Sequence, residues 1–237
     1  MRYIKKSETE PRDLREYKKN CRKASPPLKI TYKDMPKDGT RQQLARDQGY
    51  LCAYCMRRVS LDPADQLNYP NIEHLDPQNQ LPDEATTDFS NLLGVCPGNR
   101  SSTENAKKTC DAYRGILEED QQTMRLNPLD EAQMDTIFYQ RNGEIGSIDA
   151  ELNKELSDKL NLNSEAAYLL QNRETAYSQL VRFLKAKKPI GEWSKPFLQQ
   201  AWQFFCTPDK TGAYREYVGV YEYWLKHWMK KCSRAKC

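Results

Sequence analysis

Apolar residues recur at helical spacing in most of this chain but not in its central part. Isoleucine and leucine return every four residues over 148–160 with mostly polar residues between them, which predicts an amphipathic helix. A second helical stripe covers 169–184 and stops before Pro189, and Ser164 is expected as its N-cap. Aromatic and aliphatic residues form a third helical face over 214–229. The second half of the chain is therefore predicted to be helical.

The first half of the chain is predicted to contain a helical N-terminal arm followed by an irregular segment. Residues 1–36 hold four prolines around a charged stretch that favours a helical arm, and 40–50 predicts a short helix. From 51 to 115, short apolar pieces are broken by Pro, Asn, Asp and Gly, and this segment contains four cysteines and a histidine. We predict an α+β protein, a small core embedded in helical additions. The expected parts are a basic N-terminal arm and helix (1–49), the core (50–115) and a helical C-terminal region (116–237).

Composition excludes a membrane-spanning protein. The 237 residues have a mean hydropathy of -0.92, 30% of them are charged, and no apolar run approaches the ~20 residues of a membrane helix. The polar N-terminus lacks the apolar stretch of a secretory signal, so a cytoplasmic location with reduced cysteines is expected.

Charge is distributed unevenly. Residues 1–30 hold ten basic and four acidic side chains, and residues 226–237 hold five basic and no acidic ones. Because the net charge is +4, the middle of the chain sums to -7. The basic ends either approach a phosphate backbone or an acidic partner, or are simply solvated and frayed.

Four cysteines have the order and spacing of a metal site. Cys52 and Cys55 form a CxxC pair, which a tight turn can aim at one tetrahedral zinc ion. Cys96 and Cys110 would form the second pair, although 13 residues separate them. A structural zinc is favoured over ordinary buried thiols, and a redox motif is disfavoured because no βαβ unit surrounds the CxxC pair. The other cysteines are expected to be inert thiols: Cys21, Cys206, Cys232 and Cys237.

Polar residues of a different chemistry lie between and after the cysteine pairs. Glu73 and His74 are adjacent, so they can serve one site only at the end of a strand, which Asp76-Pro77 supplies. Asn91 follows 17 residues after His74, and Asp111 directly follows the last cysteine of the set.

The order CxxC, EHxxP, NLLxxC, CDxxRG resembles the HNH nuclease superfamily. That resemblance implies a ββα-metal core clamped by a four-cysteine zinc. The superfamily more often ends in a CxxCHxxK-type string, so here 97–109 would be an insertion and Asp111 would stand where the last His or Asn is found. Asn99, three residues after Cys96, is the alternative for that position.

A narrower resemblance extends over most of the chain. The segments MRYIKKS, CAYC, IEHLDP, CDAYRG, RNGEIGS and LNLN are similar to the PtuB family, the HNH subunits of Septu-type and retron-associated antiphage systems. The resemblance implies a toxic nuclease effector with a PtuA-like ATPase partner. In retron versions it also implies a reverse transcriptase with its DNA-RNA product. The aromatic C-terminal helices are plausible docking surfaces for the ATPase.

Phosphodiester hydrolysis assigns roles to these residues. His74 has the pKa range of a general base at neutral pH, and Asn91 is expected to orient it. Glu73 and Asp111 are hard oxygen ligands suited to catalytic Mg²⁺ or Mn²⁺, and Arg114 is expected to contact a phosphate.

Two alternatives stay open. His74 can be an ordinary loop histidine, and the chain can be a non-catalytic zinc-stapled nucleic-acid-binding or adaptor subunit. The substrate can be DNA, or RNA such as transfer RNA.

Overall fold

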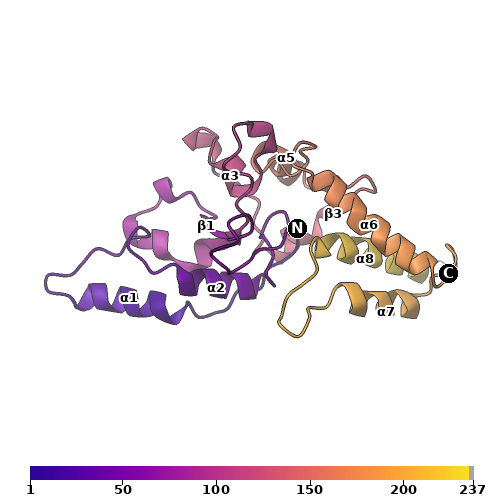
Figure 1. Cartoon of the computed structure of the whole chain (residues 1–237), viewed down its shortest axis with the longest axis horizontal. Helices are drawn as coiled ribbons and strands as arrows, with labels where there is room; N and C mark the ends of the chain where they lie inside the picture. Colours follow the sequence, from indigo (N-terminus) through magenta and orange to yellow (C-terminus); the bar gives the residue numbers. More distant parts are fainter. Residues whose placement is uncertain (235–237) are drawn as a thin grey trace.

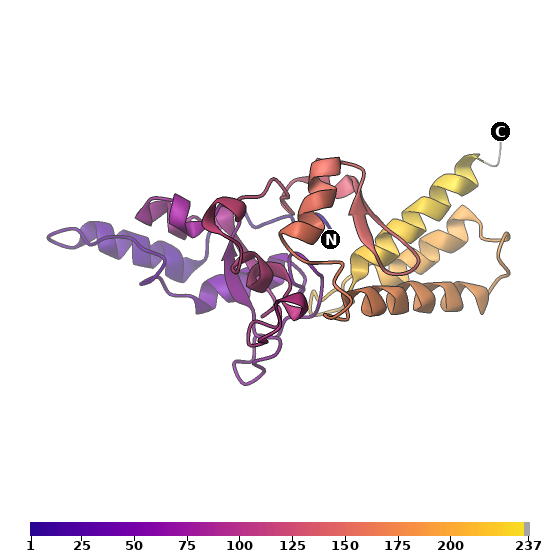
Figure 2. The ribbon, with the colours of Figure 1, turned by 90° about the horizontal axis from the view of Figure 1, so that it is seen from above.

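The computed structural model describes residues 1–234. The molecule is elongated, with a mixed helix and strand region in the middle (Figure 1). Seen from above, helix α1 lies at one end and helices α6, α7 and α8 lie together at the other (Figure 2). The predicted α+β class is confirmed. Cys237 and the last part of the basic C-terminal run lie outside the described residues.

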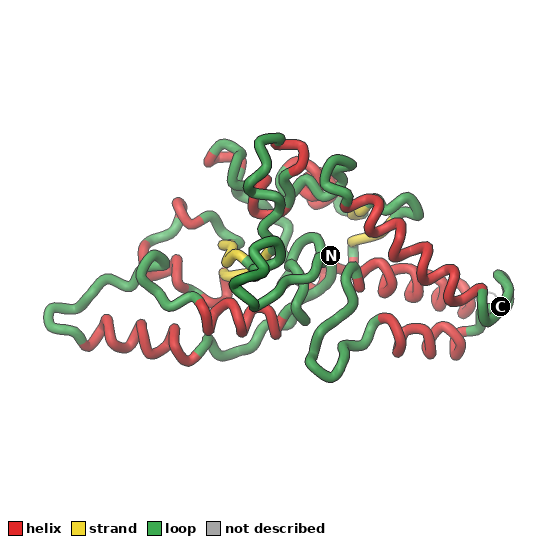
Figure 3. Tube along the Cα trace, in the orientation of Figure 1, coloured by secondary structure: helices red, strands yellow, loops and turns green. Residues whose placement is uncertain are grey.

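Helices and loops make up nearly all of the trace, and strands are confined to two small patches (Figure 3). The α-helices are α1 (Arg12–Lys23), α2 (Asp38–Asp47), α3 (Cys110–Arg114), α4 (Glu131–Asp135), α5 (Ala150–Asp158), α6 (Leu169–Lys185), α7 (Lys195–Phe205) and α8 (Val218–Arg234). Short 3-10 turns are η1 (Gln78–Gln80), η2 (Asp83–Thr87), η3 (Phe89–Asn91), η4 (Asn105–Lys107) and η5 (Glu119–Gln121). None of the described helices is both long and apolar enough to cross a membrane.

Two antiparallel strand pairs complete the fold. Strand β1 (Asn71–His74) pairs with β2 (Leu92–Val95), so that His74 lies opposite Leu92. Strand β3 (Ile137–Tyr139) pairs with β4 (Ile145–Ser147) through a turn that contains Gly143 at φ 87°. An Asn-Gly turn between apolar pieces is a strong hairpin signal, and this hairpin was not among the predicted elements.

The end of α2 is joined to β2 by a buried glutamine. The Gln48 side chain donates to the carbonyls of Leu51 at 2.8 Å and Gly94 at 2.6 Å, and its oxygen accepts from the Gly94 N–H at 2.7 Å. A buried amide is stable only when its donors and acceptor are satisfied, as they are here. This contact fixes the strand pair against the N-terminal helices.

The C-terminal helices are held by aromatic packing. Phe205 contacts the rings of Phe183, Phe204 and Tyr221 at centroid distances of 5.1, 5.0 and 4.8 Å. Helices α7 and α8 pack against one another, and α6 packs against α8. Large buried rings supply most of the apolar area of such an interface.

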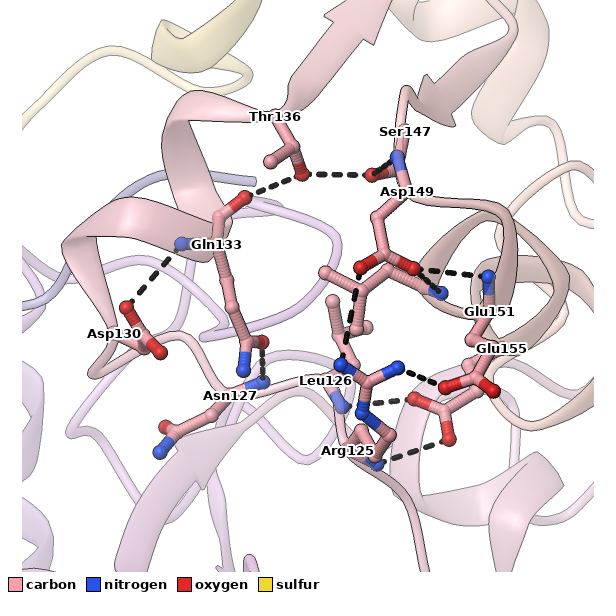
Figure 4. Close-up of polar contacts among 11 residues, drawn as sticks. Arg125, Leu126, Asn127, Asp130, Gln133, Thr136, Ser147, Asp149, Glu151 and Glu155 are labelled. Atoms are coloured by element: carbon pink, nitrogen blue, oxygen red, sulfur yellow. Dashed lines mark hydrogen bonds and ion pairs between the residues drawn. The ribbon is translucent and has the colours of Figure 1, made fainter.

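The segment between the core and α5 is fixed by polar contacts (Figure 4). Asp130 and Asp149 accept hydrogen bonds from main-chain N–H groups in the first turns of α4 and α5, as N-cap residues do. The Glu155 carboxylate accepts the N–H groups of Arg125 at 2.9 Å and Leu126 at 2.8 Å. These contacts hold the chain as it leaves the core.

The predicted helices exist with shifted ends. Residues 148–160 contain α5, but Ile148 is 81% exposed and precedes the helix. The prediction of Ser164 as N-cap is wrong: α6 begins five residues later, and the Ser164 hydroxyl donates to the Ala106 carbonyl at 2.6 Å. Helix α7 was not predicted. The local sequence favours Ser164 as a helix cap, but in the fold its hydroxyl forms a tertiary hydrogen bond instead.

Candidate metal centre and histidine site

The four predicted cysteine ligands converge. The Sγ–Sγ distances are 3.8 Å for Cys52–Cys110, 3.6 Å for Cys55–Cys96 and 3.9 Å for Cys96–Cys110, and all four ligand atoms lie within 4.8 Å of one another. A tetrahedral zinc ion with Zn–S bonds of about 2.3 Å needs sulfurs about 3.8 Å apart. The sulfurs are too far apart for disulfides, which need about 2.05 Å. The cluster therefore fits a four-coordinate ion such as zinc.

Backbone turns bring the sulfurs together. In the first knuckle, the Met56 N–H donates to the Cys52 carbonyl at 3.1 Å, and Met56 takes a left-handed φ of 62°. In the second, the Thr109 N–H donates to the Gly98 carbonyl at 3.0 Å. A side chain at Gly98, whose φ is +60°, would meet the Thr109 carbonyl oxygen at 2.2 Å. This contact closes the base of the 13-residue stretch between Cys96 and Cys110, and the two sulfurs lie 3.9 Å apart.

The thiols influence one another's protonation. Hydrogen bonds from Cys110 and the other two cysteines hold the pKa of Cys55 well below its ordinary value. Hydrogen bonds with the same neighbours and burial raise the pKa of Cys110. A metal ion bound as a thiolate complex would replace these protons, so metal binding should release protons.

The remaining described cysteines lie apart from this cluster. Cys21 and Cys206 are buried and Cys232 is half-buried, with its Sγ 3.0 Å from the Trp193 carbonyl oxygen. Within residues 1–234, the four-cysteine group is the only set of three or more Cys, His, Asp or Glu residues close enough to hold one metal ion.

His74 ends strand β1 and is held by its surroundings. Its Nε2 lies 2.8 Å from the Thr86 carbonyl oxygen, and its ring meets the Tyr32 ring edge-on at 4.6 Å. A carbonyl can only accept, so Nε2 carries the proton and Nδ1 is the basic nitrogen. Burial lowers the pKa of His74, partly offset by the Thr86 hydrogen bond, and this favours the neutral ring. The Thr86 carbonyl was missed by sequence reasoning, because a main-chain carbonyl leaves no signature in residue type.

Glu73 forms a buried ion pair with Arg114. The Arg114 guanidinium is 2.5 Å from the Glu73 carboxylate and also donates to the carbonyls of His74 at 2.9 Å, Leu75 at 2.8 Å and Gln122 at 2.7 Å. Arg114 is 4% exposed. The expected phosphate contact of Arg114 is therefore corrected: its donors are used within the chain, where they fix β1 and the turn after it.

Asp111 lies in the first turn of α3, beside Glu73. Burial raises the pKa of Glu73 well above its ordinary value and the Asp111 charge adds to this effect, while Arg114 opposes it. Asp111 also forms an ion pair with the exposed Arg100. The Asn99 amide instead donates to the Lys107 carbonyl at 2.7 Å, inside the insertion. The structure thus brings Asp111 next to Glu73 and uses Asn99 to shape a loop.

Asn91 supports the site without touching the histidine ring. Its side chain accepts from the Asp76 N–H at 2.8 Å and donates to the Asp76 carbonyl at 3.2 Å, and its own carbonyl accepts from the Leu75 N–H at 2.9 Å. The expected hydrogen bond from Asn91 to His74 is therefore corrected. Asn91 fixes the turn after His74, because its amide satisfies both main-chain groups there.

Both carboxylates already have a cationic partner. Arg114 holds Glu73 from the buried side, and Arg100 holds Asp111 from the solvent side. A hard divalent ion at this point would compete with Arg100 for Asp111, since the Arg100 side chain is 59% exposed and can move away.

The chain was compared with protein-family models and with curated protein sequences, and neither comparison finds a match.

Proposed function

We propose that this protein is a metal-dependent endonuclease of the HNH type that hydrolyses phosphodiester bonds. The observation that carries the proposal is His74: a neutral, oriented imidazole at the end of β1, beside α3 with its acidic Asp111. The antiparallel pair β1 and β2 followed by α3, stapled by four cysteines, is compatible with a ββα-metal core.

In this proposal His74 is the general base. Its Nδ1 accepts a proton from the attacking water, while Nε2–H stays on the Thr86 carbonyl and keeps the ring aimed. The hard carboxylate oxygens of Glu73 and Asp111 would hold Mg²⁺ or Mn²⁺. The chemistry that such an ion supplies is stabilisation of negative charge on the leaving oxygen. Arg114 holds the Glu73 carboxyl group in place and opposes the rise of its pKa that burial causes.

The phosphate contact first assigned to Arg114 moves to Arg100 in this proposal. Arg100 is exposed and already lies against Asp111. Its planar guanidinium can bind two phosphate oxygens at once. Substrate and divalent ion would together separate the Arg100–Asp111 pair.

The biological part of the proposal rests on the resemblance to the PtuB family. We infer that the chain is the toxic effector of an antiphage system and works with a PtuA-like ATPase. A reverse transcriptase with its DNA-RNA product would be a further partner in a retron version. DNA and RNA, including transfer RNA, are both candidate substrates, because a site that reads phosphates carries little base information.

The chain contains a matched control for its proposed base. Its other histidine, His227, lies on α8 beside Tyr223 and Trp224. Purified wild-type, His74→Ala and His227→Ala proteins should be incubated with plasmid DNA and with total RNA in Mg²⁺ or Mn²⁺. We expect cleavage to fall at least ~100-fold in His74→Ala only, because a positioned base contributes 10²- to 10⁴-fold.

Two further readouts separate loss of chemistry from loss of fold. Zinc content should be the same in both histidine variants, and circular dichroism should show that both are folded. Cleavage by folded His74→Ala at the wild-type rate would overturn the proposal and favour the non-catalytic zinc-stapled adaptor. With RNA, a terminal monophosphate marks attack by water, whereas a cyclic phosphate marks attack by the 2′-hydroxyl and would exclude the proposed step.

A further inference from the structure

Arg173 is a buried cation that forms no ion pair with another described residue. It lies on α6, is 1% exposed and donates to the carbonyls of Gly143 at 2.5 Å and Leu162 at 2.7 Å and to the Asn163 side-chain oxygen at 3.2 Å. None of the ion pairs formed between described residues includes it. A buried charge without a counter-charge is strongly unfavourable, so a negative group is expected nearby.

The cysteine cluster acts on Arg173 as a source of negative charge, together with Glu144, which follows Gly143 in the sequence. Burial lowers the pKa of Arg173 to about 10, and the charges of Cys55 and Cys110 are among those acting in the opposite direction. The backbone shows the same proximity. The Cys110 N–H donates to the Leu160 carbonyl at 2.9 Å, two residues before the Leu162 carbonyl that Arg173 binds. One short segment therefore contacts both the cluster and the buried guanidinium.

A second arginine, Arg57, lies next to the first cysteine pair in the sequence. It follows Cys55 by two residues, and its carbonyl accepts the Cys52 N–H at 2.9 Å. Its guanidinium reaches the Ala167 carbonyl at 3.4 Å, at the far end of the segment that also receives Arg173. In the part of the chain that the structure describes, Arg57 likewise takes part in none of the ion pairs.

We propose that Arg57 and Arg173 are the counter-charges of a four-thiolate metal centre. A divalent ion with four thiolates has a net charge of -2, and two guanidinium groups bring the sum to zero. In a buried site of low dielectric constant, such neutralisation favours the fully deprotonated, metal-bound state. Because Arg173 belongs to α6, the metal centre is then shared between the core and the C-terminal helices. This inference is independent of nuclease activity.

The test compares charge with shape at both arginines. Full-length Arg173→Gln, Arg173→Lys, Arg57→Gln and Arg57→Lys proteins are loaded with Zn²⁺, and the dissociation constant is measured by competition with a chromophoric chelator. Arg15→Gln, on the exposed face of α1, is the matched control. We expect each Gln variant to bind zinc 10- to 100-fold more weakly, the range for outer-shell partners, and each Lys variant to stay near the wild type.

Two results would overturn the proposal. Wild-type zinc affinity in both Gln variants, with only a lower melting temperature, would mean that the arginines merely tie loop carbonyls together. An equal loss in Lys and Gln variants would mean that the guanidinium shape matters and the charge does not. If Arg173→Gln fails to fold, the half-buried Arg57 decides alone, and wild-type affinity in Arg57→Gln then rejects the pairing.

Discussion

The central region and the C-terminal helices reach stability by different means. Strands β1 and β2 have four residues each, and the turns around them are short, so regular backbone hydrogen bonding contributes little there. Helices α6 and α8 have 17 residues each and bury large side chains against one another. Four converging thiols that bind a metal ion can stabilise a polar, irregular segment as buried apolar area stabilises a helical bundle.

Metal removal should separate the two regions most clearly. Chelation is expected to unfold residues 51–115 first, because a structural zinc site can contribute on the order of 10 kcal/mol of folding free energy. Amide hydrogen exchange should show protection lost in that segment while α6 and α8 keep most of theirs. A metal-free protein with unchanged circular dichroism and melting would contradict the role given to the cluster.

Removing an aromatic ring from the C-terminal helices should destabilise those helices and leave the metal centre unchanged. Phe205→Ala is expected to lower the free energy of unfolding by about 3–5 kcal/mol, because the ring is 5% exposed and lies among three others. Phe204→Ala is the control, since that neighbouring ring is 51% exposed and should cost clearly less. Urea unfolding measures both, and zinc affinity should change in neither.

A backbone substitution tests the pinched base of the insertion. Gly98→Ala places a methyl group 2.2 Å from the Thr109 carbonyl at a left-handed φ, so we expect a loss of about 1–3 kcal/mol together with weaker zinc binding. Gly212→Ala is the control, because its φ is also positive but nothing lies within 4 Å of the added carbon. Equal zinc affinity in the two variants would show that the pinch does not shape the metal site.

The histidine site predicts a particular pH dependence. Burial lowers the pKa of His74 below 6.5, so the neutral base predominates above that pH and cleavage should be level from pH 7 to 8. Below the folded pKa, the rate should fall about tenfold per pH unit as the base is protonated. The unfolded chain binds this proton more readily, so His74 also lowers the free energy of unfolding as pH falls below 6.5. An acid limb centred above pH 7 would reject His74 as the base.

The smallest effect is expected from the exposed arginine. Arg100→Gln should change the free energy of unfolding by less than about 1 kcal/mol, because its pair with Asp111 is solvent-accessible. Arg114→Gln, which breaks a buried pair, should cost about 3–5 kcal/mol. Thermal unfolding of the two variants side by side tests this contrast, and similar losses would contradict the different roles assigned to them.

Sequence reasoning succeeded where residue type and spacing carry the information. The CxxC pair and the two later cysteines were enough to predict the cluster, since thiol ligands are recognisable wherever the backbone brings them together. Periodic leucines likewise predicted α5 and α6, with errors at the ends. Asp111 was expected near Glu73 only because the insertion was assumed, and spacing alone did not separate it from Asn99; in the structure Asp111 acts on Glu73 and Asn99 binds the Lys107 carbonyl.

The missed contacts depend on groups that every residue possesses. The Thr86 carbonyl that orients His74, and the carbonyls that satisfy Arg114, are main-chain atoms whose positions follow from the whole fold. Asn91 was predicted to hydrogen-bond the His74 side chain, but its amide binds the main chain of Asp76. A sequence shows which side-chain groups are present, but tertiary packing determines which hydrogen-bond partners they meet.

The closed base of the insertion also bears on how this protein can vary. The hydrogen bond from the Thr109 N–H to the Gly98 carbonyl fixes the two ends of the loop between these residues. Doubling the length of a flexible loop costs only about 0.6 kcal/mol in closure entropy. Arg100 pairs with Asp111 and Ala106 is bound by Ser164, so the stretch 101–105 between them is the natural position for lengthening the sequence, for instance to carry a tag or a binding peptide, while the sulfur positions beneath it stay unchanged.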